Sequence, residues 1–182
     1  MRQIAGKLAL ASLLSACAFF VNAQETAVPT FKQVFLSQLD DTEKKLVGLA
    51  EAMPQEKYAW RPAEGVRSVG ELFMHEAGAN IFFMTFVGVK PPVGFDPKGE
   101  KTVTDKAKII QALKDSFAHV RQAMAKMTEE DMLKPTKVMG RPASYQAALF
   151  VMSTHMHEHL GQAIAYARMN GVTPPWSKGK DS

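Results

Sequence analysis

The sequence is poor in cysteine, and this scarcity limits its covalent chemistry and its metal chemistry. Cys17 is the only cysteine among 182 residues, and it lies in the apolar N-terminal stretch. No intrachain disulfide can therefore form, and residues 24–182 hold neither a thiolate metal ligand nor a thiol nucleophile. Any metal ion bound by those residues must be held by nitrogen and oxygen atoms.

The chain also has little net charge and few long apolar runs. Its formal charge is +4, and residues 24–182 retain 20 basic residues against 18 acidic ones, or +2. This excess is too small to favour nucleic-acid binding, so we expect no nucleic-acid partner. Beyond residue 23, no apolar run approaches the roughly 20 residues that span a bilayer, so we do not expect an integral membrane protein.

The first 23 residues have the pattern of an export signal. Two basic residues are followed by an apolar stretch over residues 8–21, and small residues form a cleavage site that ends at Ala23. We therefore predict a signal peptide over residues 1–23. The mature domain would span residues 24–182 and be periplasmic or secreted.

A lipoprotein anchored at Cys17 is the alternative. The segment Leu14-Ser15-Ala16-Cys17 has the small-residue-then-cysteine form of a lipobox. The apolar run continues through residues 18–21, however, where a lipidated protein usually begins a polar tether. Both forms of processing place the domain outside the cytoplasm.

The spacing of apolar residues predicts an all-α fold. It indicates four helices of about 20 residues each, over residues 30–53, 68–86, 104–127 and 144–169. Thr104 and Ser144 are suitable N-caps, and Ser68-Val69-Gly70-Glu71 has the form of a capping box. The proline- and glycine-rich residues 88–103 should form a long surface connection, and residues 136–139 at most a short extended piece. Four such helices favour a four-helix bundle, whose handedness the long connections leave open.

Three histidines form a candidate metal site. His155 and His159 are four residues apart, so on a helix both rings lie on one face and reach the same point. Such a pair alone can equally be two solvent-exposed histidines that bind no metal. His75 strengthens the case because it lies in an apolar stretch, where an unpaired ring would be costly, although a core histidine bonded to a carbonyl would also fit. Three imidazoles from two helices could hold a divalent ion.

Other polar residues near these histidines receive more ordinary interpretations. His157 lies about 200° round the helix from its neighbours and should face solvent, while His119 should be exposed or at a rim. Gln162 could orient a ligand from outside the coordination sphere, or make an ordinary interhelical hydrogen bond. Glu76 and Glu158 each adjoin a candidate ligand, but adjacent helical residues diverge by about 100°, so neither is expected as a fourth ligand.

Several motifs together resemble one known family. They are Trp60-Arg61-Pro62, S-x-G-E-L-x-x-H over residues 68–75, H-x-x-x-H-x-G-Q over residues 155–162, Y-x-R-x-N-G over residues 166–171, and Pro174-Pro175. In this combination the sequence resembles the DinB/YfiT-like family, over roughly residues 31–176.

The resemblance implies a four-helix bundle of DinB/YfiT type with a divalent metal near one end. By position, the ligands would be His75, His155 and His159, with water completing the coordination. The family contains thiol-dependent S-transferases, proposed hydrolases and members without a known activity. Two departures weaken the transferase reading: Leu160 stands where the family commonly has an arginine or similar residue, and the thiol-transferring members are cytoplasmic whereas this chain has an export pattern.

These observations favour an exported metal-dependent hydrolase or transferase whose substrate is a small molecule. Imidazole ligands favour zinc or nickel, and iron or manganese would also fit. Three ligands leave an open position, in a pocket that we expect between the helices 68–86 and 144–169 and the connection 88–103. The alternatives are a non-catalytic envelope protein that binds a metal or small ligand, and a structural metal clip with function at a surface or homodimer interface.

Overall fold

Four long helices make up most of the molecule, as predicted. The computed structural model describes residues 28–177 and 179, so the predicted signal peptide at 1–23 and the alternative anchor at Cys17 lie outside the described residues. The helices are α1 (Phe31–Ala52), α2 (Val69–Thr85), α4 (Lys106–Lys126) and α5 (Tyr145–Met169), and α3 (Gly99–Thr102) is a single turn. The all-α fold class is therefore confirmed.

Side-chain caps fix where the helices begin. In the predicted capping box before α2, the Ser68 hydroxyl accepts from the backbone N–H of Glu71, whose carboxylate accepts from the backbone N–H of Ser68. Ser144 caps α5 as expected. The prediction that Thr104 caps the third long helix was wrong by one residue. Asp105 caps α4 instead, because its carboxylate accepts from a backbone N–H at 2.9 Å and its charge favours the helix N-terminus.

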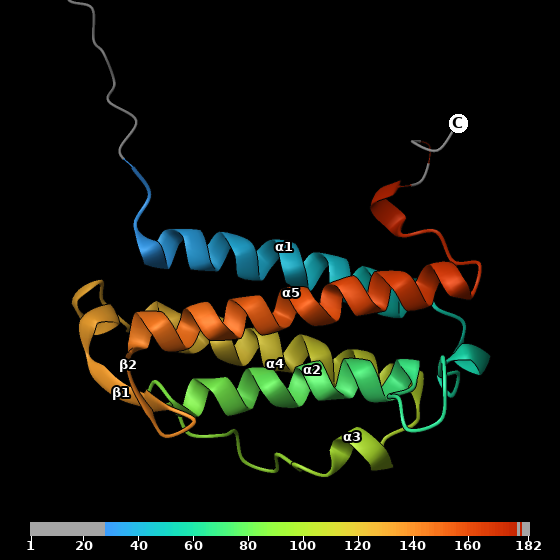
Figure 1. Ribbon diagram of the computed structural model, residues 1–182, viewed down its shortest axis with the longest axis horizontal. Coiled ribbons are helices and arrows are strands. Elements are labelled where there is room, and N and C mark those ends of the chain that lie inside the picture. Colours follow the sequence, from blue (N-terminus) through green and yellow to red (C-terminus); the bar gives the residue numbers. More distant parts are fainter. Residues whose placement is uncertain (1–27, 178, 180–182) are drawn as a thin grey trace, which may run out of the picture.

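The helices pack in a ring, so that each long helix touches two others. α1 packs against α4 and α5, and α2 packs against the same two helices. Figure 1 shows that α1 and α5 run in one direction and α2 and α4 in the other. The shared interior is filled by large apolar side chains, among them Leu39, Leu46, Phe117 and Met156.

The parallel course of α2 and α4 explains the long connection between them. A chain that leaves one end of α2 must travel back along the bundle before it can begin α4. Residues 86–105 do so on the outside of the bundle, and α3 lies on this return path (Figure 1). The predicted surface connection is thus present, with a helical turn that its proline and glycine content did not indicate.

A small hairpin joins α4 to α5 and corrects the sequence prediction. Residues 136–139 were expected to form at most a short extended piece, but β1 (Pro135–Val138) pairs antiparallel with β2 (Arg141–Ser144). Met139 and Gly140 both have positive φ, 48° and 81°, as a two-residue hairpin loop with a type I′ turn requires. Prolines at 135 and 142 obscured the strands in the sequence, because proline cannot donate to a ladder.

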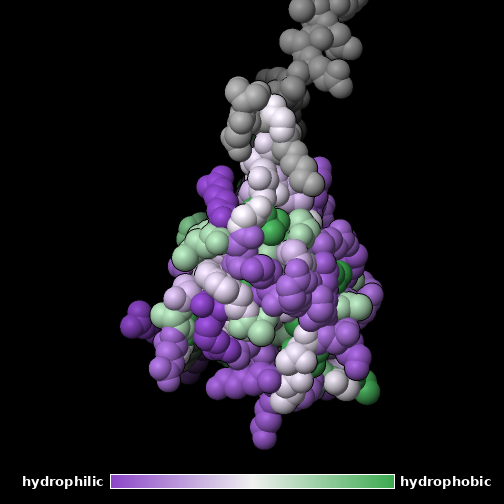
Figure 2. Space-filling view, turned by 90° about the vertical axis from the view of Figure 1, so that its right-hand side faces the viewer, coloured by the Kyte–Doolittle hydropathy of each residue, from purple (hydrophilic) through white to green (hydrophobic). Residues whose placement is uncertain are grey.

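The end of the bundle where α2 begins and α5 ends has a mainly hydrophilic surface. Figure 2 shows hydrophilic residues over most of this face, with hydrophobic ones in small groups between them. Across residues 28–177 and 179, no helix is both long and apolar enough to cross a membrane.

Candidate metal centre

The structure brings His75, His155 and His159 together between α2 and α5. The Nε2 atom of His155 lies 3.4 Å from Nε2 of His75 and 3.2 Å from Nε2 of His159. One ligand atom from each ring can be chosen so that all lie within 4.8 Å of one another. Among the described residues, no fourth histidine, cysteine or carboxylate side chain joins this group.

Each ring has an oxygen near its other nitrogen. Nδ1 of His75 lies 2.9 Å from a carboxylate oxygen of Glu100, and Nδ1 of His159 lies 3.0 Å from the amide oxygen of Gln162. Nδ1 of His155 lies 3.5 Å from a carboxylate oxygen of Glu76. A carboxylate or an amide oxygen accepts hydrogen bonds, so the surroundings of His75 and His159 favour a proton on Nδ1. Glu76 is an acceptor near Nδ1 of His155, but no hydrogen bond joins the two groups.

With the protons on Nδ1, three Nε2 lone pairs point at one another without a donor between them. A divalent ion would resolve this arrangement, because neutral imidazole binds metals through a free lone pair. Tetrahedral coordination at a Zn–N distance of about 2.05 Å places two nitrogens about 3.3 Å apart. The observed separations of 3.4 and 3.2 Å therefore fit such an ion.

A charged network supports His75 from the solvent side. The carboxylate of Glu100 accepts from Nε of Arg67 at 2.7 Å as well as from His75. Burial raises the pKa of Glu100, but the hydrogen bonds from Arg67 and His75 outweigh it and leave that pKa below its ordinary value. Burial lowers the pKa of His75, and together with the nearby charge of Arg67 it outweighs the opposite effect of Glu100. Near neutral pH, the pair is therefore an anionic carboxylate beside a neutral ring, which is the form of histidine that binds metals.

A chain of hydrogen bonds fixes the partner of His159. The amide N–H of Gln162 donates to the hydroxyl of Tyr166 at 2.8 Å, and this hydroxyl donates to the backbone carbonyl of Arg67 at 3.2 Å. The Gln162 amide is therefore held with its oxygen toward His159. Of the two roles that the sequence allowed for Gln162, the structure shows contact with a candidate ligand.

The other predicted residues lie as follows. His157 is exposed, and its Nδ1–H donates to the carbonyl of Ser153 at 2.7 Å. Glu158 is also exposed. His119 is half-buried and lies at the edge of a pocket, in agreement with a rim position.

Sequence reasoning missed the roles of Glu76 and Glu100. Glu76 is not one of the converging groups, as expected, but it is fully buried and faces the outer nitrogen of His155 on the neighbouring helix. A carboxylate inside the apolar run of residues 72–81 was the available signal, because such a group is rarely buried without a partner. Glu100 gave no comparable signal, since it lies in a connection 25 residues away from His75.

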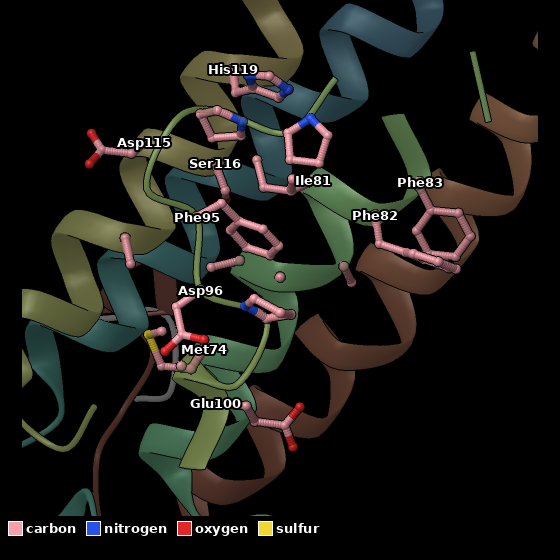
Figure 3. A pocket seen from close by; sticks show the side chains of 18 of the residues that line it. Met74, Ile81, Phe82, Phe83, Phe95, Asp96, Glu100, Asp115, Ser116 and His119 are labelled. Carbon is pink, nitrogen blue, oxygen red and sulfur yellow. The ribbon is translucent and has the colours of Figure 1, made fainter. Parts of the chain in front are cut away.

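A pocket of about 930 Å³ adjoins the histidine cluster, and both His75 and His155 line it. The connection covers it, as predicted, but the second wall differs from the prediction. α4 forms that wall opposite α2, and α5 contributes His155 alone. The cause is the parallel packing of α2 and α4, whose outer groove lies directly under the returning chain. Figure 3 shows Glu100 at one end of the pocket, His119 at the other, and Phe95 pointing from the connection toward α2.

Solved structures with the same fold come from bacteria. A DinB-like protein from Bacillus cereus ATCC 10987 superposes with a TM-score of 0.69 at 21% identity, over 78% of this chain and 93% of that one. YfiT from Bacillus subtilis superposes with a TM-score of 0.61 at 16% identity, over 81% and 93% of the two chains. That protein is described as a probable metal-dependent hydrolase with an unusual four-helix bundle topology. At these identities, the likeness establishes the fold.

Sequence comparison places the chain in a family. The uncharacterized protein YjoA of Bacillus subtilis strain 168 is 24% identical over 139 residues, which cover 76% of this chain and 88% of that protein. A sequence model that describes the DinB superfamily matches residues 38–163. The resemblance seen in the motifs is thereby confirmed, and the chain belongs to the DinB superfamily.

Proposed function

We propose that this protein is a metal-dependent hydrolase or transferase that holds one divalent ion through His75, His155 and His159. The observation that carries the proposal is the convergence of the three rings: Nε2 of His155 lies 3.4 Å from Nε2 of His75 and 3.2 Å from Nε2 of His159, and a ligand atom can be chosen from each ring so that all lie within 4.8 Å of one another. The fold shared with YfiT, described as a probable metal-dependent hydrolase, supports the same reaction class.

The number of ligands argues for reactivity rather than for a structural clip. Structural zinc sites are normally closed by four protein ligands, whereas catalytic sites keep a position for water or substrate. The converging group comprises three side chains within the described part of the chain, and a pocket lies beside it. A small molecule that enters the pocket can therefore reach the ion.

Hydrolysis at this site needs an activated carbonyl and an oriented water. A divalent ion would supply positive charge that polarises the carbonyl and lowers the pKa of a water. Water then adds to the carbonyl carbon, the bond to the leaving group breaks with its electron pair, and the leaving group takes a proton. Glu100 and Gln162 orient the rings of His75 and His159 through hydrogen bonds at Nδ1, and hydrogen bonds of this kind increase the ligand strength of imidazole. Glu76 lies 3.5 Å from Nδ1 of the third ring, that of His155.

Metal content of purified protein and single histidine variants tests the ligand set. We expect one divalent ion per chain in the unaltered protein. His75→Ala, His155→Ala and His159→Ala should each lose the ion, because only two protein ligands then remain to coordinate it. His157→Ala is the matched control, since this exposed ring lies on the same turn of α5 and bonds only to Ser153. Stoichiometric metal in all three ligand variants would refute the proposal.

Replacement of the native ion by cobalt tests whether a position is open. Its visible absorption should change when a small carboxylate is added, because the carboxylate takes the free position. An unchanged spectrum would favour a closed, structural ion. Hydrolysis of small esters or amides that is lost on chelation and restored by metal would then separate an enzyme from a non-catalytic metal binder.

A further inference from the structure

The pocket beside the candidate ligands is poorly suited to a highly charged molecule. Among the described residues that line it, there is no lysine or arginine, and three carboxylates, those of Asp96, Glu100 and Asp115, stand around it. A phosphate-rich or otherwise polyanionic substrate would meet like charge there without a cationic side chain. Only a metal ion at the histidines would supply positive charge.

Most of the residues that line the pocket are instead apolar, and His75 and His155 are among the others. Aromatic and aliphatic side chains come from α2 and from the connection, among them Ile81, Phe82, Phe83 and Phe95 (Figure 3). The ring of Phe83 packs edge-on against His155, with centroids 5.2 Å apart. An apolar group in this pocket would therefore sit directly beside whatever the histidines hold.

Gly78 keeps part of this space free. It lies in the middle of α2 and lines the pocket, and a Cβ atom placed on it would have nothing within 4 Å. Glycine in a helix interior is destabilising relative to alanine, because it loses more backbone freedom on folding. The helix thus carries a glycine where a larger side chain would fit, at a point facing the pocket.

We infer that the substrate carries an apolar acyl group, aliphatic or aromatic, that lies in the pocket between α2, α4 and the connection. The carbonyl at the end of this group faces His75 and His155. This inference rests on the proposed metal-dependent function and adds the class of substrate: uncharged esters, amides or related derivatives of apolar carboxylic acids.

Alkyl hydroxamates of increasing length are suitable probes, because the hydroxamate head binds a metal ion and the alkyl tail stands in for the acyl group. Binding to zinc-loaded protein is measured by titration calorimetry for acetohydroxamate, butanohydroxamate and hexanohydroxamate. Each methylene that is fully buried should tighten binding about fourfold, so hexanohydroxamate, with four more methylenes than acetohydroxamate, should bind up to about 250-fold tighter.

Gly78→Leu should remove this gain from chain length, so that the three hydroxamates bind with similar affinities, because leucine occupies the tail's space. The variant should fold, since its side chain meets open space and leucine favours helix. Gly161→Leu is the matched control: Gly161 is an exposed glycine of α5 with equally open space, and it lies outside the pocket. Gly161→Leu should keep the gain in affinity with chain length across the three hydroxamates.

The outcomes separate the two proposals. Binding of acetohydroxamate with no gain for longer chains would overturn the apolar acyl inference alone. A gain that persists in Gly78→Leu would overturn it too, because the tail would then lie elsewhere. If zinc-loaded protein bound no member of the series, the open metal position of the proposed function would fall, and this inference with it.

Discussion

The carboxylate of Glu76 lies 3.5 Å from Nδ1 of His155, and it has no hydrogen-bond partner among the described residues. Glu76 is 0% exposed, so its carboxyl group is held away from water. A buried carboxyl group without a hydrogen-bond partner is costly, and the ring nitrogen that it approaches is Nδ1 of His155. A metal ion on the far side of this ring would strengthen the Nδ1–H as a donor and bring positive charge close to the carboxylate. Glu76 should therefore destabilise the metal-free fold and strengthen metal binding by His155.

Replacement of Glu76 by glutamine should separate these two effects. In metal-free protein, Glu76→Gln should raise the melting temperature, because an amide costs less to bury than a carboxylate without a hydrogen-bond partner. Its affinity for zinc should fall toward the lower end of the roughly 10- to 100-fold usual for a changed outer partner, because glutamine keeps an acceptor oxygen but is a weaker acceptor than a carboxylate. Thermal unfolding in the presence of a chelator measures the first effect, and zinc titration against a competing chelator measures the second.

Glu158→Gln is the control for this pair of measurements, because Glu158 adjoins His159 but is exposed. It should change neither quantity appreciably. Zinc affinity that remains unaltered in Glu76→Gln would show that His155 does not depend on the buried carboxylate.

The hydrogen-bonded chain beyond His159 gives a graded prediction. Gln162→Leu removes the acceptor at Nδ1 of His159 and should weaken zinc binding. Tyr166→Phe keeps that acceptor and the edge-on packing against Trp60, but removes the hydroxyl that holds the amide. Its zinc affinity should fall less than that of Gln162→Leu, with a loss of about 1 kcal/mol in the free energy of unfolding. Zinc titration and denaturant unfolding of both variants check this order, and a greater affinity loss in Tyr166→Phe would contradict it.

The four helices could be predicted from the sequence because each carries a local signal. Apolar residues repeat at helical spacing, and caps such as Ser68 and Ser144 mark the starts. The hairpin could not be predicted in the same way. Its pairing depends on positive φ at Met139 and Gly140 and on prolines at tolerated positions, neither of which gives an alternating pattern. The direction of α4 relative to α2 depends on how the helices pack, and so does the wall that α4 contributes to the pocket. Neither could be predicted from local sequence patterns.

The candidate ligands could be predicted for a related reason. The spacing of His155 and His159 is a helical property, and the family motifs add His75. Glu76 and Glu100 could not be linked to the histidines in advance. Glu76 contacts a ring on a different helix, and Glu100 reaches His75 only because the connection returns along the bundle. Contacts between elements that are far apart in sequence follow from the tertiary arrangement, which periodicity alone does not determine.

The N-terminal sequence predicts that the mature chain begins at Gln24 or at a lipidated Cys17. The intact mass of protein isolated from its native host distinguishes these two forms, because lipidation adds mass to the longer chain. An unprocessed chain that starts at Met1 in the cytosol would contradict both. It would also favour a thiol-dependent transferase over an exported hydrolase, since the thiol-transferring members of the family are cytoplasmic.

His119 should make the fold sensitive to acid in a way that does not involve the metal. Its Nε2 is buried without a hydrogen-bond partner among the described residues, and burial lowers the pKa of the ring below its ordinary value. The unfolded chain takes up this proton near pH 6.5, whereas the folded chain does so only at lower pH. Between these two values the unfolded state binds more protons, so the free energy of unfolding decreases as the pH falls through this window.

His119→Gln should therefore lose less stability on acidification than the unaltered protein. Melting temperatures of both proteins, measured in the presence of a chelator at about pH 7.5 and about pH 5, test this expectation. The lowered pKa of His75 acts in the same direction but is present in both proteins, so the comparison isolates His119. At the higher pH the ring is neutral in both states, and its titration contributes nothing to the difference between the proteins. An equal fall in melting temperature for the two would mean that the buried nitrogen of His119 gains a proton as readily in the folded chain as in the unfolded one.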